Sequence, residues 1–237
     1  RLLVAQAGLS NDTGALATFL FTGPSGVGKT QLAIYLAEFL FGNQESLIRL
    51  DMSEYKEEHS VSKLIGSPPG YVGYEDEGQL TSKLRTHPYS VVLLDECEKA
   101  HPNVYDLFLQ VLDAGRLTDS KGRNIDTRNA IFILTSNISS FNAGSINKTE
   151  QVIENETLAK LGEYFRVEFL NRIDELIVFR FLTEESIRKI LLRNLEELSQ
   201  KFWKKQGVEI IFSDNAVDCL LYAGYTPQLG ARELFRT

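Results

Sequence analysis

The chain has 237 residues, of which 43% are hydrophobic and 24% are charged, and its formal net charge is −7. This composition is ordinary for a globular protein of one large domain, or of one large and one small domain. It argues against a membrane span, which needs roughly 18 to 20 consecutive apolar residues. It also argues against nucleic acid as a partner, because such proteins carry a basic surface.

The first part of the chain predicts strands that alternate with helices. Residues 18–22 form a short apolar run before a glycine-rich loop, and residues 47–51 predict the second strand. A helix is expected over about 28–41, because leucines recur there at helical spacing: Leu32, Leu36 and Leu40. Residues 60–86 predict two helices around a loop rich in proline and glycine.

The middle of the chain continues this alternation. Residues 90–95 form a continuous apolar run, which predicts a strand buried on both faces. Pro102 opens a helix with one apolar stripe: Val104, Leu107, Phe108, Val111 and Leu112. Residues 116–128 predict a turn or small hairpin, 130–134 the fourth strand, and 136–155 a loop. Alternating strands and helices predict a mainly parallel sheet covered on both faces.

The pattern changes after the fifth predicted strand, residues 176–179. Thr183 is a predicted N-cap of a long helix lined on one face by Ile187, Ile190, Leu191, Leu195 and Leu198. A strand over 208–212 and a further helix should follow. We therefore expect a large α/β domain of residues 1–181 and a smaller, mainly helical domain of residues 182–237.

The two cysteines, Cys97 and Cys219, are far apart and form no CxxC pair. We expect two buried free thiols in a protein of a reducing compartment. With two Cys and three His in the chain, a metal site built from these residue types is not expected.

Residues 23–30 fit the phosphate-binding pattern G-x-x-x-x-G-K-[ST], between a predicted strand and a predicted helix. Glycines let backbone N–H groups turn toward phosphate oxygens, and the helix N-terminus adds partial positive charge. Lys29 is expected to reach the β- and γ-phosphates, and Thr30 to offer its hydroxyl to Mg²⁺. The predicted nucleotide-binding residues are Gly23, Pro24, Ser25, Gly26, Val27, Gly28, Lys29 and Thr30.

An acidic pair ends the apolar run VVLLDE at 91–96. Asp95 is expected to hold Mg²⁺, directly or through water, and Glu96 to orient and deprotonate the attacking water. Such a pair is weak evidence alone, but downstream of a phosphate loop it predicts hydrolysis rather than binding alone. Asn137, in the sequence TSN after the fourth strand, is either a polar group for the lytic water and γ-phosphate or a turn and cap residue.

These motifs, in this order, resemble those of the AAA+ ATPases. Further segments resemble the second AAA+ module of the Clp unfoldases ClpB, ClpA, ClpC and ClpV: GSPPGYVGYEDEGQLT (66–81), DECEKAHP (95–102), GRLTDSKGR (115–123) and EFLNRIDELIVF (168–179). The match covers nearly the whole chain. The resemblance implies an AAA+ P-loop NTPase fold, with a mainly parallel five-stranded sheet flanked by helices and a small helical lid domain that is incomplete at Thr237.

The resemblance also implies roles for residues outside the phosphate motifs. Tyr71 and Val72 match the pore loop that grips an unfolded polypeptide; from the residues alone, Tyr71 reads as packed in a structural turn. Arg172 matches the arginine finger that acts on a neighbouring subunit's nucleotide, and Arg232 matches the second sensor of the small domain. Without the resemblance, both arginines read as ordinary surface residues.

The resemblance implies an ATP-hydrolysing motor that binds ATP or ADP with Mg²⁺, assembles as a hexameric ring and threads unfolded or aggregated polypeptide through its pore. Residues 137–155 lack the glycine-containing hydrophobic tripeptide with which ClpA and ClpC dock onto the ClpP peptidase, which favours a disaggregase. The alternatives are a regulatory ATPase subunit of a Clp protease, an AAA+ ATPase associated with nucleic acid, and a nucleotide-switched scaffold. The expected location is the cytoplasm, or the lumen of a bacterium-derived organelle.

Overall fold

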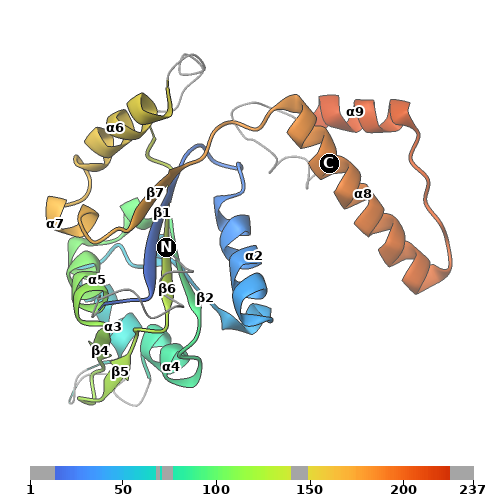
Figure 1. Ribbon diagram of the computed structural model, residues 1–237. Helices are drawn as coiled ribbons and strands as arrows, with labels where there is room; N and C mark the ends of the chain where they lie inside the picture. The colour runs from blue at the N-terminus through green and yellow to red at the C-terminus, as the bar shows by residue number, and fades with distance from the viewer. Residues whose placement is uncertain (1–13, 68–69, 71–76, 140–148, 225–237) are drawn as a thin grey trace. The chain divides into compact units, whose positions relative to one another are not determined.

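The computed structural model describes residues 14–67, 70, 77–139 and 149–224. Its residues divide into two compact units (Figure 1). The first unit comprises the described residues up to Thr22 and Lys29–Val178, and the second comprises Gly23–Gly28 and the described residues from Phe179 onward. No helix in these ranges is both long enough and apolar enough to cross a membrane.

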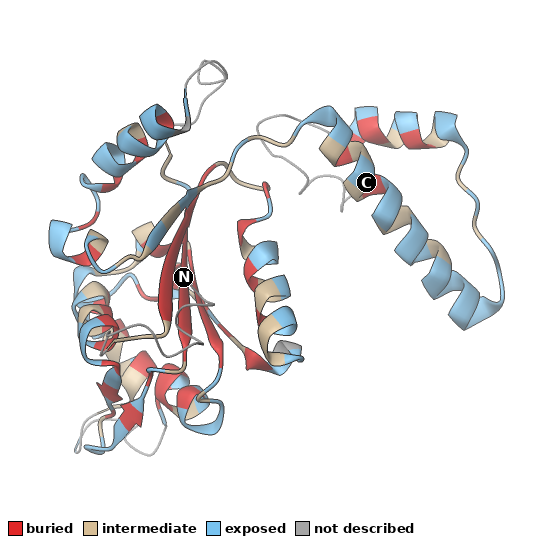
Figure 2. Cartoon of the chain, viewed as in Figure 1, coloured by how far each residue is buried: buried red, intermediate tan, exposed pale blue. Residues whose placement is uncertain are grey.

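A five-stranded sheet forms the centre of the first unit, in the order β2-β3-β6-β1-β7. Every pairing in it is parallel. The strands are β1 (Ala17–Thr22), β2 (Leu47–Asp51), β3 (Val91–Asp95), β6 (Ile131–Ser136) and β7 (Glu175–Val178). β1, β3 and β6 are buried along their whole length (Figure 2), as expected of strands covered on both faces. The predicted parallel five-stranded α/β fold is confirmed.

Helices cover both faces of this sheet (Figure 1). The α-helices of the first unit are α2 (Lys29–Phe41), α3 (Val61–Ile65), α4 (Gln79–Thr86), α5 (Pro102–Ala114), α6 (Glu150–Leu161) and α7 (Val167–Leu170). The short 3-10 turns are η1 (Gln44–Ser46), η2 (Met52–Glu54), η3 (Glu58–Ser60) and η4 (Cys97–Lys99). α5 buries its predicted stripe: Val104, Phe108, Val111 and Leu112 fully and Leu107 in part. It begins at Pro102 and ends at Gly115, whose φ of 60° suits a glycine C-cap.

α2 packs on β3 and β6 through small residues rather than through its leucines. Ala33 and Ala37 are completely buried, whereas Leu32 is 42% exposed and Phe39 is 86% exposed. Residues four apart share one helix face, and alanines there let the helix axis lie close to the sheet. The leucine spacing therefore predicts the helix correctly but not the face that it buries.

The predicted hairpin is present as β4 (Arg116–Thr118) and β5 (Asn124–Asp126), which pair antiparallel. Asp119 organises the turn between them. Its carboxylate accepts backbone N–H groups of the turn at 3.0 and 2.8 Å and the Nε–H of Arg123 at 2.6 Å. These donors replace the water that the buried carboxylate loses.

Two expectations about irregular segments are wrong. The predicted loop 136–155 extends too far, because α6 begins at Glu150. The predicted strand 208–212 is absent; its apolar, β-branched sequence finds no partner strand, and a strand without one leaves its backbone groups unpaired. Instead, the Ser199 hydroxyl donates to the Ile210 carbonyl at 2.9 Å and accepts its N–H at 3.3 Å.

The second unit contains α8 (Glu184–Gln206) and α9 (Asp214–Gly224). The Thr183 hydroxyl accepts the Ser186 N–H at 3.2 Å, so the predicted N-cap is present. The core of this unit lies between the two helices and consists of the buried residues Ile187, Leu191, Val217 and Leu221, with Ile190 and Leu195 packed against them. Leu198, predicted on the same face, is 41% exposed.

The two cysteines differ in burial. Cys97 is buried as predicted, but Cys219 is exposed, which corrects the expectation of two buried thiols. On α9, Val217 and Leu221 share the buried face of the helix. Cys219 is midway between them in the sequence and therefore lies on the opposite, exposed face. Burial holds the pKa of the Cys97 thiol well above its usual range.

Candidate functional site

The phosphate-loop motif joins β1 directly to α2 along the chain, as predicted. Gly23 has φ of 144°, and a Cβ there would lie 2.5 Å from the Phe179 carbonyl oxygen, so a side chain does not fit. Gly28 has φ of 99°, a conformation that other residues rarely adopt. A loop with such conformations can turn consecutive N–H groups toward one anion.

Lys29 and Asn137, predicted separately, lie together. Lys29 is the first residue of α2, Asn137 follows β6, and the Lys29 Nζ donates to the Asn137 Oδ1 at 3.0 Å. The Asn137 backbone N–H donates to the Glu98 Oε1 at 3.2 Å, which fixes the start of this loop. This position places the Asn137 amide beside the ammonium that the phosphate-loop motif predicts to bind phosphate, and the role of Asn137 there remains a prediction.

Asp95 is held from several elements at the carboxyl edge of the sheet. The Thr30 hydroxyl lies 3.2 and 3.3 Å from its two carboxylate oxygens. From β6, the Thr135 hydroxyl donates to Oδ1 at 2.6 Å. From β2, the Arg49 guanidinium forms an ion pair with Oδ2 at 2.6 Å. Thr30 and Asp95, each predicted to bind Mg²⁺, therefore lie side by side, and Asp95 has two further partners.

Thr135 and Arg49 are the site residues that sequence reasoning missed. Thr135 belongs to the TSN motif, of which only Asn137 was predicted to act in the site. Arg49 is the single cation in the otherwise apolar run LIRL of β2. Because adjacent strands of a parallel sheet end at the same edge, the charge in that run was a signal that Arg49 could lie near Asp95.

Glu96 has an unusual backbone conformation. Among the described residues it is the only non-glycine with positive φ, at φ 56° and ψ 49°. Its N–H donates to the Thr135 hydroxyl at 3.0 Å, which holds the turn. Its carboxylate pairs with Lys99, and this hydrogen bond raises the pKa of Lys99. Left-handed backbone in a non-glycine residue costs about 1–3 kcal/mol and gathers at functional sites.

The donor set around Thr30 and Asp95 fits Mg²⁺. A hydroxyl and a carboxylate are the hard oxygen ligands that Mg²⁺ prefers, and their spacing of 3.2–3.3 Å is close to the roughly 2.9 Å between adjacent octahedral ligands. The described residues contain no group of three or more His, Cys, Asp or Glu placed to hold a metal.

Comparison with known families identifies the chain. Residues 15–176 match the model of the AAA domain (Cdc48 subfamily). The chain belongs to this AAA family. Residues 182–237 match the C-terminal, D2-small domain, of ClpB protein.

Relatives of this AAA module are Clp proteins. The chain is 50% identical over 242 residues to the chaperone protein ClpB of Aquifex aeolicus, covering 98% of the chain and 24% of the relative. It is 47% identical to the ATP-dependent Clp protease ATP-binding subunit ClpC of Staphylococcus aureus, covering 98% and 30%. A structure of Hsp104 with ATPγS and FITC casein in a closed state superposes with a TM-score of 0.88 at 40% identity, covering 99% of the chain and 41% of Hsp104. The chain thus spans less than half of each relative.

Arg172 lies at the other edge of the AAA sheet from Asp95. It lies three residues before the first residue of β7, and Asp174, which directly precedes β7, is joined to Thr18 near the start of β1 by backbone and side-chain hydrogen bonds of 2.9 and 2.8 Å. Parallel strands begin at the edge opposite to the one where they end. Arg172 pairs instead with Asp113 in the last turn of α5, and its side chain is half exposed. The structure therefore does not bring Arg172 to Lys29 and Asp95 of its own chain.

Three predicted site residues lie outside the described residues: Tyr71, Val72 and Arg232. Their roles remain predictions from the resemblance.

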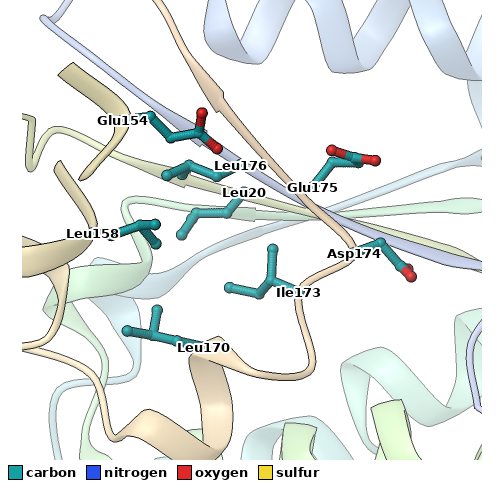
Figure 3. Close-up of a pocket in the computed structure, with 8 residues that line it drawn as sticks. All are labelled: Leu20, Glu154, Leu158, Leu170, Ile173, Asp174, Glu175 and Leu176. Carbon is teal, nitrogen blue, oxygen red and sulfur yellow. The ribbon is translucent and has the colours of Figure 1, made fainter. Parts of the chain in front are cut away.

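A separate hollow of about 200 Å³ lies between α6, α7 and β7 of the AAA module (Figure 3). Aliphatic side chains of leucine and isoleucine line it together with three acidic residues: Glu154, Asp174 and Glu175.

Proposed function

We propose that the chain is the second ATPase module of a Clp-type unfoldase or disaggregase, with a large domain of residues 1–181 and a lid of residues 182–237. Hydrolysis of ATP in a ring, expected to be hexameric, would pull unfolded or aggregated polypeptide through a central pore. One observation supports this most: Lys29, Thr30, Asp95 and Asn137, from three places in the sequence, meet at one edge of the sheet. Membership in the AAA family and likeness to Hsp104 solved with casein point the same way.

The chain's own groups supply most of the hydrolytic chemistry in this proposal. The phosphate loop binds the triphosphate, and the Lys29 ammonium moves from Asn137 to the β- and γ-phosphates. Asn137 is then free to orient the lytic water or sense the γ-phosphate. Thr30 and Asp95 would hold Mg²⁺, which neutralises phosphate charge when bound. Glu96 takes the proton of the attacking water.

Further residues would act between subunits, on the lid or on substrate. Arg172 would stabilise transition-state charge on the neighbouring subunit's nucleotide, which agrees with its place at the opposite sheet edge. Arg232 would couple nucleotide state to movement of the lid. Tyr71, with Val72, would grip substrate, since an aromatic side chain makes sequence-tolerant contacts.

The hydrolase step is tested by Glu96→Gln in the assembled protein. Loss of the base should leave ATP binding intact and lower turnover at least about 100-fold. Glu163→Gln is the matched control, because Glu163 is an exposed acid in the turn after α6. Equal, measurable turnover in wild type and Glu96→Gln would refute Glu96 as the base, and no turnover in the assembled wild type would refute hydrolysis and favour the scaffold alternative.

The threading step is tested by Tyr71→Ala, with Tyr89→Ala as the control because Tyr89 is 62% exposed. We expect Tyr71→Ala to hydrolyse ATP yet fail to unfold a stable reporter protein. Normal unfolding by this variant would remove the pore-loop role.

A regulatory subunit of a Clp protease is the second candidate, favoured by the 47% identity to ClpC. Degradation of the unfolded reporter on addition of a ClpP-type peptidase separates the two, since a disaggregase releases the reporter intact. Action in the cytoplasm is part of either proposal.

A further inference from the structure

The Asp95 carboxylate is surrounded by donors on both oxygens. Oδ1 accepts from Thr135 at 2.6 Å and Oδ2 from Arg49 at 2.6 Å, while the Thr30 hydroxyl lies within 3.3 Å of both. The Asp95 side chain is 11% exposed. A carboxylate so far removed from water needs a cation nearby, and Arg49 supplies it.

Arg49 differs from the other two partners of Asp95, Thr135 and Thr30, in how firmly its side chain is held. Thr135 is buried on β6 and Thr30 is fixed at the start of α2. Arg49, by contrast, is 53% exposed, so its guanidinium can leave for solvent at little cost. Register explains its reach: Asp51 is opposite Asp95, and Arg49, two residues earlier, lies on the same face as Asp51.

Arg49 and Mg²⁺ would therefore compete for the same position beside the Asp95 carboxylate. Arg49 donates to the carboxylate that, by the fit described above, would hold the ion or one of its waters. Two cations beside one carboxylate repel each other, and repulsion over a few ångströms in a partly buried site is substantial. The acidic pair is also matched in charge without metal, since Glu96 has Lys99 and Asp95 has Arg49.

We propose that Arg49 is a positioning residue that stands in for Mg²⁺: it neutralises and orients Asp95 when no metal is bound, and it competes with the metal. This inference rests on the proposed nucleotide site. Its consequence is a built-in weakening of metal binding, so that the site keeps its geometry between turnovers without holding the ion tightly. Arg49 need touch neither nucleotide nor water for this.

The test measures binding rather than turnover. Mg²⁺ is titrated at a fixed concentration of a fluorescent ADP analogue, and the Mg²⁺ concentration at half-maximal binding is compared between variants. Arg49→Gln, which removes the charge, should lower this concentration about 3- to 10-fold. Arg49→Lys should stay near wild type. Arg128→Gln is the matched control, because Arg128 forms an exposed ion pair with Asp126.

A second readout uses reciprocity, since competition works in both directions. Without metal, Arg49→Gln should melt at a lower temperature than wild type, because Asp95 has lost its cation. With Mg²⁺ and ADP, the gain in Tm should be larger for Arg49→Gln than for wild type. A lost surface ion pair of purely structural importance would lower Tm equally with and without Mg²⁺.

The outcomes separate the two proposals. If wild type binds the analogue with Mg²⁺ dependence and Arg49→Gln shows an unchanged or raised half-maximal concentration, the competition is refuted while the nucleotide site stands. If wild type binds no nucleotide at any Mg²⁺ concentration, the proposed function falls and this inference falls with it.

Discussion

Thr135 joins the two acidic residues of the site, so its hydroxyl should be worth more than a typical buried hydroxyl. It is 1% exposed, donates to Asp95 at 2.6 Å and accepts the Glu96 N–H at 3.0 Å. Thr135→Val keeps the shape and removes both bonds. A hydrogen bond to a charged group contributes about 1.5–3 kcal/mol and a neutral one about 1 kcal/mol. We expect the free energy of unfolding to fall by about 3 kcal/mol.

Urea denaturation followed by far-UV circular dichroism measures this loss, because the sheet lies in the unit that carries Thr135. Thr22→Val is the control: Thr22 ends the neighbouring strand, is completely buried, and its hydroxyl has no hydrogen-bond partner among the described residues. Removing an unpaired buried hydroxyl should be neutral or slightly stabilising. Equal losses in the two variants would show that the hydroxyl of Thr135 does not hold the acidic pair, and the reasoning would be refuted.

Two further predictions concern groups away from the site. A thiol reagent should label the folded chain once, at Cys219, because Cys97 is buried and its pKa is raised by that burial; labelling of both thiols before unfolding would contradict this. Burial alone would raise the pKa of Asp119, but N–H donors of its turn, with Arg123, outweigh it and lower the pKa. The stability from Asp119 is therefore present above its unfolded pKa of about 3.9 and is lost as pH falls through the lowered folded value. Asp119→Asn should cost about 1–3 kcal/mol at pH 7 and progressively less below pH 4 in urea titrations; a pH-independent cost would contradict the ionic role.

The sequence carries enough information for the sheet because its strands are continuous apolar runs with no competing pattern. The bounds of β2 come out to the residue, and those of the other strands to within one or two residues. The helix of the phosphate loop was equally plain, but its buried face was not. Periodicity shows that leucines share a side; whether leucine or alanine faces the sheet depends on how closely the two layers approach, and that distance is a tertiary quantity.

At segment 208–212, by contrast, the composition predicts an element that the structure does not form. Its residues, VEIIF, have the composition of a strand, but a strand exists only where a second one offers its backbone. Here a single serine on α8 meets both polar groups of Ile210, which satisfies the backbone locally. Composition shows which secondary structures a segment can adopt, and the surrounding packing determines which one it forms.

The site residues likewise divide into those that sequence motifs predict and those whose role depends on tertiary contacts. Lys29, Thr30, Asp95 and Asn137 were predictable because their motifs fix residue types at strand ends, and parallel strands bring those ends together. The roles of Arg49 and Thr135 were not predicted, because each depends on the residues that it contacts across the sheet, and the charge in β2 signals only that Arg49 lies near this edge. The left-handed turn at Glu96 belongs to this second class, since no local sequence signal requires it and the Thr135 hydroxyl maintains it.

The distribution of charge over the two sheet edges bears on how such a module works. Lys29, Asp95 and Glu96 lie where strands end, and Arg172 lies where β7 begins, held by Asp113 of α5. In the proposed mechanism, one chain thus has the nucleotide-binding half of a hydrolytic site at one edge and the Arg172 guanidinium at the other. Because the sheet lies between them, Arg172 would complete catalysis only when a second copy brings its opposite edge to the first. On this reasoning assembly is a condition for turnover, and Asp113, by fixing the direction of Arg172, sets which geometry of assembly is productive.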